Sequence, residues 1–256
     1  MIFESHAHYD DSKFDDDREE LLSTMQENGI EKIINIGCSI ESCKSTLELT
    51  KQYPFVYGAM GIHPSDIGDL NEDTFLWLRE QVKKEKVVAV GEIGLDYYWD
   101  KEEEVQKNQR IWFRRQLELA KENNLPVIIH SRDAAADTME IMKEAYVQGI
   151  KGVIHCFSYS KEQAQEYVKM GYYIGVGGVA TFKNAKKLKE VIETIPLEKI
   201  LLETDCPYMA PEPYRGKRNS SLYLPYVVEK IAGLKGVTAK EVEEAVSYTH
   251  LTLPTT

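Results

Sequence analysis

The 256-residue sequence lacks several features that would define its class. It has no run of 18 or more apolar residues, so we expect no membrane-spanning helix. Its N-terminal residues do not form the basic and apolar regions of a signal peptide, and its four cysteines contain no CxxC pair. These absences favour a cytoplasmic protein with reduced cysteines and no membrane partner.

Net positive charge is also missing. The chain has 31 lysine and arginine residues against 42 aspartate and glutamate residues, for a formal charge of -11. Proteins that bind nucleic acid over a broad surface usually carry a basic face, so the composition weighs mildly against such a partner. Any contact with a polyanion must be local, through metal ions and a few basic side chains.

No linker rich in proline, glycine or serine, no low-complexity tract and no repeat divides the chain, which indicates a single domain. Short runs rich in valine and isoleucine alternate with longer segments of helical period, as in a parallel sheet covered by helices. The predicted strands are residues 2–6, 32–37, 55–61, 87–93, 126–130, 152–156, 172–177 and 199–203. The predicted helices are residues 16–28, 42–52, 72–84, 103–123, 135–148, 161–170, 185–194, 222–234 and 239–246.

Eight such units predict an α/β fold, a (β/α)8 TIM barrel, over residues 1–246. A doubly wound open sheet is the alternative, but no GxGxxG turn follows the first strand. Residues 247–256 carry no charged side chain, in contrast to the helix before them. A natural terminal segment and a cloning or sequencing scar both fit this atypical tail, and we assign no function to His250 within it.

The spacing of histidines gives the first indication of chemistry. His6 and His8 follow an extended run, and side chains along a strand repeat every second residue, so both imidazoles point the same way. Two imidazoles at a strand end can bind one divalent ion. Catalytic residues of a (β/α)8 barrel lie at the C-terminal ends of its strands. Histidines and acids gather at the predicted ends, as His6, His8, His63, Glu92, His130, His155, Glu203 and Asp205.

Six of these residues suffice for two divalent ions, namely His6, His8, Glu92, His130, His155 and Asp205. A carboxylate such as Glu92 can bridge two ions that lie about 3.5–4 Å apart. His6, His8 and Asp205 would complete one ion, and His130 and His155 the other. Nitrogen and oxygen donors without thiolates suit Zn, Mn, Co or Mg, and ligand positions left to water are typical of a catalytic site.

Other residues at the strand ends have both a functional and a structural interpretation. Asp205 can take a proton from the attacking water, while His63 either orients a phosphate oxygen or holds its loop. Glu203 is interpreted as the partner of a ligating histidine or as a member of a salt bridge. The aromatic residues 97–99 either stack on a base or cap the mouth of the barrel. The basic residues that could bind phosphate are Arg132, Arg215, Lys217 and Arg218, for which pairing with acids or simple solvation is the alternative.

Together these motifs resemble those of the TatD family of metal-dependent hydrolases, in the amidohydrolase superfamily. The matching stretches are Ser5-His6-Ala7-His8, Gly61-Ile62-His63-Pro64, Gly91-Glu92-Ile93-Gly94-Leu95-Asp96-Tyr97-Tyr98, His130-Ser131-Arg132-Asp133, His155-Cys156-Phe157-Ser158, Glu203-Thr204-Asp205-Cys206-Pro207-Tyr208 and Pro213-Tyr214-Arg215-Gly216-Lys217-Arg218-Asn219. The resemblance implies a metal-dependent deoxyribonuclease that trims DNA from the 3′ end. The chain departs from the family pattern at Glu4-Ser5, where Asp-Thr is more usual, and at Tyr159, where glycine is usual.

The expected function is hydrolysis of DNA phosphodiester bonds by a 3′–5′ exonuclease that uses a water activated by two metal ions. Asp205, Glu92 and His63 are expected to be catalytic, and single-stranded DNA ends are the expected substrate. We infer no obligate protein partner. The main alternative is an amide- or ester-cleaving hydrolase, such as a deacylase, on the same barrel. A metal-binding scaffold without turnover is a weaker alternative.

Overall fold

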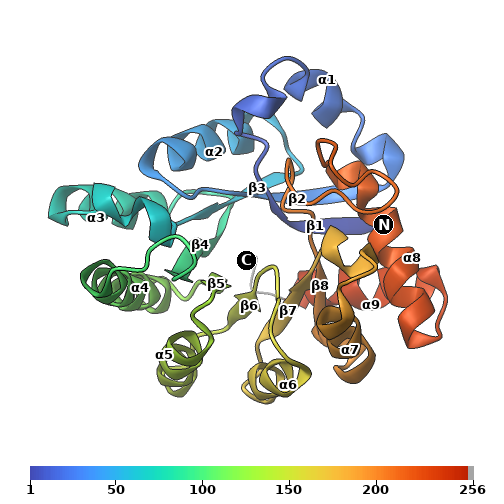
Figure 1. The fold of residues 1–256 in the computed structure, drawn as a ribbon. Helices are drawn as coiled ribbons and strands as arrows, with labels where there is room; N and C mark the ends of the chain where they lie inside the picture. Colours follow the sequence, from blue (N-terminus) through green and yellow to red (C-terminus); the bar gives the residue numbers. More distant parts are fainter. Residues whose placement is uncertain (253–256) are drawn as a thin grey trace. The chain divides into compact units, whose positions relative to one another are not determined.

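A computed structural model of the protein describes the backbone of residues 1–252 and the side chains of residues 1–246. The strands form one eight-stranded sheet in which β1 to β8 follow their order in the sequence (Figure 1). They are β1 Ile2–Ala7, β2 Ile30–Ile36, β3 Val56–Met60, β4 Val87–Asp96, β5 Val127–Arg132, β6 Gly152–Ile154, β7 Tyr173–Val176 and β8 Ile200–Leu202. The predicted tail, His250 included, lies outside the residues whose side chains are described.

Helices follow the strands along the chain, so the predicted (β/α)8 fold in one domain is confirmed. The helices are α1 Arg18–Ser23, α2 Ile40–Gln52, α3 Glu72–Gln81, α4 Glu103–Glu122, α5 Ala135–Val147, α6 Lys161–Lys169, α7 Lys186–Thr194, α8 Leu224–Lys235 and α9 Ala239–Thr252. Among the described residues, no helix combines the length and the apolar character needed to cross a membrane. The domain contains two compact units, Met1–Asn35 with Cys156–Thr256, and Ile36–His155.

In the first unit, β1 pairs with β2 on one side and with the exit of β8 on the other. The pairing with β2 is parallel, with Phe3 opposite Lys32, and Ala7 forms a parallel bridge with Cys206. The Asp205 N–H donates to the carbonyl of His6 at 2.9 Å, and the His8 N–H donates to the carbonyl of Cys206 at 2.8 Å. These backbone bonds bring the end of β1 beside the segment that leaves β8.

In the second unit, the parallel strands β3 to β6 are flanked by α2, α3, α4 and α5 (Figure 1). The central strand β4 is buried along its whole length of ten residues, as expected for a strand covered on both faces. Its Gly94, at a φ of 149°, lies against the neighbouring strand, because a Cβ atom there would overlap the carbonyl of His130. Glycine therefore lets β4 and β5 approach closely where both carry predicted ligands.

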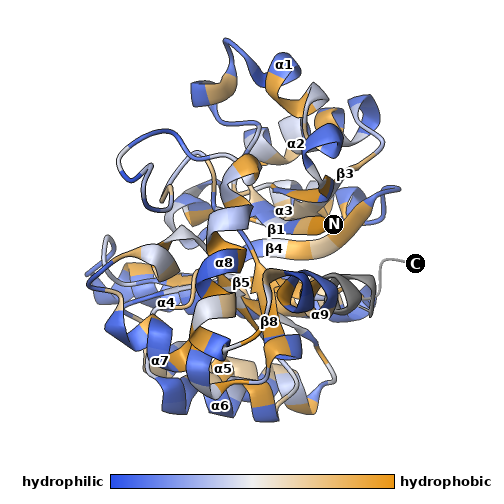
Figure 2. Ribbon diagram, turned by 90° about the vertical axis from the view of Figure 1, so that its right-hand side faces the viewer, coloured by the Kyte–Doolittle hydropathy of each residue, from blue (hydrophilic) through white to orange (hydrophobic). Residues whose placement is uncertain are grey.

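Hydropathy separates the strands from the helices. Figure 2 shows hydrophobic residues concentrated on the strands, whereas the helices carry both hydrophobic and hydrophilic residues. In α7, for example, the buried side chains are Leu188, Val191 and Ile192, whose spacing places them on one face of the helix. Burial of such faces supplies the main favourable contribution to folding.

The local signals at helix ends are largely confirmed. Gly29, Gly149 and Gly171 all have the positive φ of a left-handed cap, and Thr238 and Glu241 form the predicted capping box. The first predicted helix is wrong in extent, because α1 covers only Arg18–Ser23 and is followed by a 3₁₀ turn, Gln26–Asn28. The hydroxyl and the N–H of Thr24 both donate hydrogen bonds to the carbonyl of Leu21. These bonds end the helix early.

A buried carboxylate lies beneath the end of β1. Glu4 accepts hydrogen bonds from the Thr204 N–H at 2.8 Å, the Thr204 hydroxyl at 2.7 Å, the Ser221 hydroxyl at 2.9 Å and the His6 N–H at 3.2 Å. Burial raises the pKa of Glu4 to about 7, although these hydrogen bonds favour the ionised form. Glu4 thereby joins β1, the exit of β8 and the 3₁₀ turn Ser221–Tyr223, which precedes α8, in one polar network.

We expect Glu4→Gln to lower the free energy of unfolding by about 1–3 kcal/mol, because an amide group replaces one acceptor oxygen and leaves buried donors without a partner. Urea denaturation followed by circular dichroism measures the change. Glu229→Gln, at an exposed position of α8, is the matched control. Equal stability of the two variants would contradict the structural role of Glu4.

Candidate metal centre

The first group of potential ligands, the β1 cluster, consists of His6, His8 and Asp205. The Nε2 atoms of His6 and His8 lie 3.1 Å apart. The Asp205 Oδ1 lies 3.6 Å from the first of these atoms and 3.3 Å from the second. Donor atoms that bind one zinc ion at about 2.0–2.2 Å stand about 3.0–3.5 Å from one another, so this arrangement fits three ligands of a single ion.

The backbone of the first unit explains why these three side chains converge. His6 is the last but one residue of β1 and His8 follows the strand, so both side chains lie on one side of it. Asp205 has a φ of 57°, and its N–H donates to the carbonyl of His6. Aspartate tolerates this left-handed conformation better than most residues, and such conformations gather at functional sites.

The second group, the β4 cluster, has Glu92 at its centre. One carboxylate oxygen, Oε1, lies 2.8 Å from His130 Nδ1, 3.7 Å from His155 Nε2 and 3.9 Å from His63 Nε2. Glu92 and His155 are buried, and His63 and His130 are half-buried. The cluster therefore gathers two residues within β4 and β5, Glu92 and His130, and two residues that follow β3 and β6, His63 and His155, around one oxygen atom.

His63 has a second contact that defines its protonation. The Ser65 N–H donates to His63 Nδ1 at 3.1 Å, which begins the 3₁₀ turn Pro64–Asp69. An accepting Nδ1 carries no proton, so the neutral ring carries its proton on Nε2, the atom that faces Glu92. This tautomer suits a hydrogen-bond donor toward the cluster better than a metal ligand, whose nitrogen must offer a lone pair.

Asp96 was not predicted as a site residue, yet it contacts a predicted ligand. Its Oδ2 lies 3.1 Å from His130 Nε2, while the other ring nitrogen faces Glu92. Burial alone would lower the pKa of His130, but the hydrogen bonds to Asp96 and Glu92 outweigh it and raise the pKa. Burial would raise the pKa of Asp96, and the bond to His130 reverses that direction. Strand alternation, which puts Glu92, Gly94 and Asp96 on one side of β4, is the signal that could have identified it.

The predicted basic residues differ in their surroundings. Arg218 is engaged by both oxygens of Asp17, at 2.7 and 2.5 Å, which lowers the pKa of that carboxyl. The guanidinium carbon of Arg215 lies 4.3 Å from the centre of the Phe182 ring, and Lys217 Nζ lies 5.8 Å from the Tyr214 ring. Arg218 thus has the paired role that the sequence left open.

Glu203 is held by the backbone of its own unit. Its Oε1 accepts a hydrogen bond from the Cys156 N–H at 2.7 Å, and the side chain is buried. A Cβ atom at Gly175 of β7 would overlap the Glu203 carboxylate. The glycines of residues 175–178, which resemble a phosphate-binding loop in sequence, therefore include one that makes room for this carboxylate.

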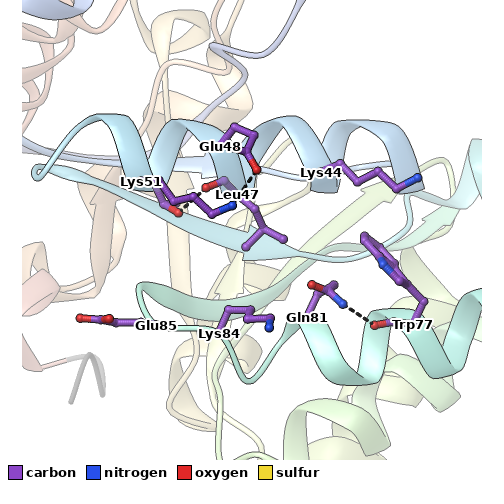
Figure 3. A pocket seen from close by; sticks show the side chains of 9 residues that line it. Lys44, Leu47, Glu48, Lys51, Trp77, Gln81, Lys84 and Glu85 are labelled. Atoms are coloured by element: carbon purple, nitrogen blue, oxygen red, sulfur yellow. Dashed lines mark hydrogen bonds and ion pairs between the residues drawn. The ribbon is translucent and has the colours of Figure 1, made fainter.

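A pocket of about 490 Å³ lies between α2 and α3 (Figure 3). Charged side chains dominate its walls, and one lysine, Lys51, is paired with Glu48 at 2.7 Å. Its lining residues are Lys44, Leu47, Glu48, Thr50, Lys51, Trp77, Gln81, Lys84 and Glu85. None of these nine is a predicted site residue, so the pocket is separate from the predicted chemistry.

A family model described as TatD related DNase matches residues 3–252. The chain belongs to the TatD family. It is 45% identical over 243 residues to the uncharacterized metal-dependent hydrolase YabD of Bacillus subtilis, with 94% of each chain covered. It is 31% identical over 232 residues to the 3′-5′ ssDNA/RNA exonuclease TatD of Cronobacter sakazakii, covering 88% of this chain and 87% of that protein. The crystal structure of the TatD homologue YjjV from Escherichia coli matches with a TM-score of 0.92 and 33% identity. The match covers 98% of this chain and 97% of the YjjV chain.

This TatD protein is accordingly a metal-dependent hydrolase, and its donor groups fit that class. The β1 cluster offers two imidazole nitrogens and a carboxylate oxygen. In the β4 cluster Glu92 and His130 offer the same donor types, and His155 Nε2 lies 3.7 Å from the same carboxylate. Neither group contains a thiolate, and each includes a buried member, so both match the mixed nitrogen and oxygen sites of catalytic metals.

Metal content tests the β1 cluster. We expect His8→Ala combined with Asp205→Asn to lower the bound metal of the zinc-loaded protein by about one ion per chain, because two of three ligands are lost. Both side chains are half-buried, so circular dichroism should show a folded protein. His250→Ala is the matched histidine control. Full metal content in the folded double variant would refute this ligand set.

Proposed function

We propose that this TatD protein is a deoxyribonuclease that removes nucleotides from the 3′ ends of single-stranded DNA. The observation that carries the proposal is the pair of clusters, in each of which imidazole and carboxylate groups lie within 4.8 Å of one another. The family model and the exonuclease named among the relatives support the choice of a phosphodiester over other substrates.

The proposed metal ligands are those predicted from the sequence. His6, His8 and Asp205 would hold one divalent ion, and Glu92, His130 and His155 would hold a second. When bound, such ions would supply a Lewis acid for the phosphoryl and leaving oxygens and a water of lowered pKa. Zn, Mn, Co and Mg all accept these donors.

Two side chains are proposed to handle protons and charge directly. Asp205 keeps its carboxylate at the exit of β8 through the backbone bond to His6, where it can take the proton of the attacking water. His63 donates from Nε2 to a phosphoryl oxygen, because Ser65 holds the other nitrogen as an acceptor. The Asp205 carboxylate belongs to the β1 cluster, and His63 Nε2 faces the β4 cluster, so each group is placed for its proposed role.

We propose that Arg132, Arg215 and Lys217 bind phosphate in this acidic protein. Arg218 is instead assigned to hold its loop, because its guanidinium is bound to Asp17 and to the Lys13 carbonyl. So small a number of phosphate contacts implies weak binding and only a shallow fall of affinity with salt.

The substrate assignment is tested with linear and circular single-stranded DNA at equal nucleotide concentration in Mg, Mn or Zn. We expect release of mononucleotides from the 3′ end of the linear strand and no cleavage of the circle, because the enzyme acts at an end. The same preparation is tested on amide and ester substrates. Rapid cutting of the circle would refute the exonuclease, and turnover of an acyl substrate without any DNA cleavage would favour a deacylase.

The donor role of His63 makes a second prediction. We expect His63→Ala to lower kcat by about 100-fold, the usual cost of one lost donor to a developing oxyanion, with metal content unchanged. His63→Gln, whose amide can still donate, should recover part of the rate. Loss of one metal ion in the alanine variant would instead identify His63 as a ligand.

A further inference from the structure

The loop after β4 carries two exposed aromatic rings beside the β4 cluster. The side chain of Trp99 is 67% exposed and that of Tyr98 42% exposed, although large aromatic residues are usually covered. The two rings meet edge to face, with centres 4.8 Å apart and planes at 83°. The residues lie between Asp96, the last residue of β4, and Glu103, the first of α4.

A cation from the neighbouring strand stacks on these rings. The guanidinium carbon of Arg132, the last residue of β5, lies 3.9 Å from the centre of the Tyr98 ring and 5.5 Å from that of Trp99. Arg132 is exposed to solvent. A stacked guanidinium retains its N–H groups at the edge for a phosphate, while the Trp99 ring remains largely accessible.

The backbone of the loop is held rigidly through the same carboxylate that contacts His130. Asp96 Oδ1 accepts hydrogen bonds from the N–H groups of Tyr98 at 3.0 Å and Trp99 at 3.1 Å, while its Oδ2 faces His130. The Asp96 side chain therefore connects the loop to His130, a proposed metal ligand. An exposed aromatic pair on a rigid loop loses little conformational entropy on binding a ligand.

The adjacent tyrosine is excluded from this surface. The hydroxyl of Tyr97 donates to Asp137 at 2.7 Å and accepts from Arg110 at 2.9 Å. Burial and the bond to Asp137 raise the pKa of Tyr97 to about 12, so its hydroxyl stays protonated. Tyr97 anchors the start of the loop on α4 and α5, which leaves Tyr98, Trp99 and Arg132 as a separate surface, here called the aromatic platform.

We propose that the aromatic platform is a binding site for an unpaired nucleobase of the nucleic-acid strand. The indole of Trp99 would stack on the base, and the guanidinium of Arg132 would bind the phosphate of the same strand. A nucleotide contains both a planar base, which suits the exposed Trp99 ring, and an anionic phosphate, which suits the adjacent Arg132. A base paired in a duplex has both faces stacked, so this site selects single strands. The inference rests on the proposed nuclease function.

The test measures binding without turnover, on metal-free protein in EDTA. Fluorescence anisotropy compares a labelled tetrathymidylate with versions in which each of the last three nucleotides in turn is abasic. For the wild type we expect loss of one particular base to weaken binding about 10-fold, the usual scale for one stacked base. Trp99→Ala should remove this preference and leave binding of the abasic strand unchanged, whereas Trp99→Phe should retain most of it.

Tyr146→Ala is the matched control, because Tyr146 lies on α5 and is 49% exposed. It should bind like the wild type. The inference is overturned if no abasic version binds the wild type more weakly, or if Trp99→Ala keeps the preference. Hydrolysis of the same strand by the metal-loaded wild type separates the two proposals: cleavage with an unchanged preference in Trp99→Ala rejects only the platform. Absence of both cleavage and binding rejects the nuclease function and the platform together.

Discussion

A buried carboxylate oxygen surrounded by imidazoles is the interaction on which the second unit, Ile36–His155, depends. Glu92 is buried in the middle of β4, where an uncompensated charge would be very costly. His130, His155 and His63 all face its Oε1, at 2.8, 3.7 and 3.9 Å. A fold selected for stability alone would fill this position with an apolar side chain, as it does with Val90 of the same strand. A polar cluster buried at this cost is what a metal-dependent hydrolase is expected to contain, because a divalent cation would compensate the buried charge.

Asp96 connects this cluster to the loop after β4, because its carboxylate contacts His130. Carboxylates that contact the second nitrogen of a ligating histidine hold its ring in place and make it a better donor. Asp96 would do this for the proposed ligand His130 with one oxygen, and it binds the backbone of the aromatic platform with the other. The loop proposed to bind a base is thus connected to a proposed metal ligand. Any shift of Trp99 or Tyr98 is resisted by a carboxylate whose orientation also defines that of His130.

Much of the fold and the positions of the predicted ligands could be derived from sequence, because parallel strands impose strong local patterns. Runs of valine and isoleucine located β1 to β8, and a histidine or acid after such a run locates the end of a strand. Other features depend on contacts between distant residues. Arg218 pairs with Asp17, 201 residues away, so a loop that looks like a basic patch contains one arginine already neutralised. The role of Asp96 requires the orientation of the His130 ring, and the early end of α1 depends on how Thr24 bonds to Leu21. Residue spacing could place Asp96 on the same side of β4 as Glu92, but it does not encode these contacts between distant residues.

Electrostatics connects the acidic composition with recognition of a strand end. A chain with a formal charge of -11 repels a polyanion at a distance. Contacts with many successive phosphates of DNA are therefore unfavourable. With Arg218 held by Asp17, the proposed phosphate contacts are those of Arg132, Arg215 and Lys217. Stacking on an aromatic ring is insensitive to net charge, because it depends on the faces of the ring and the base. An acidic protein can thus gain affinity for one nucleotide at a time without the basic face that continuous binding would require. Recognition by a ring and a single cation favours a terminal nucleotide, whose base is the easiest to unstack.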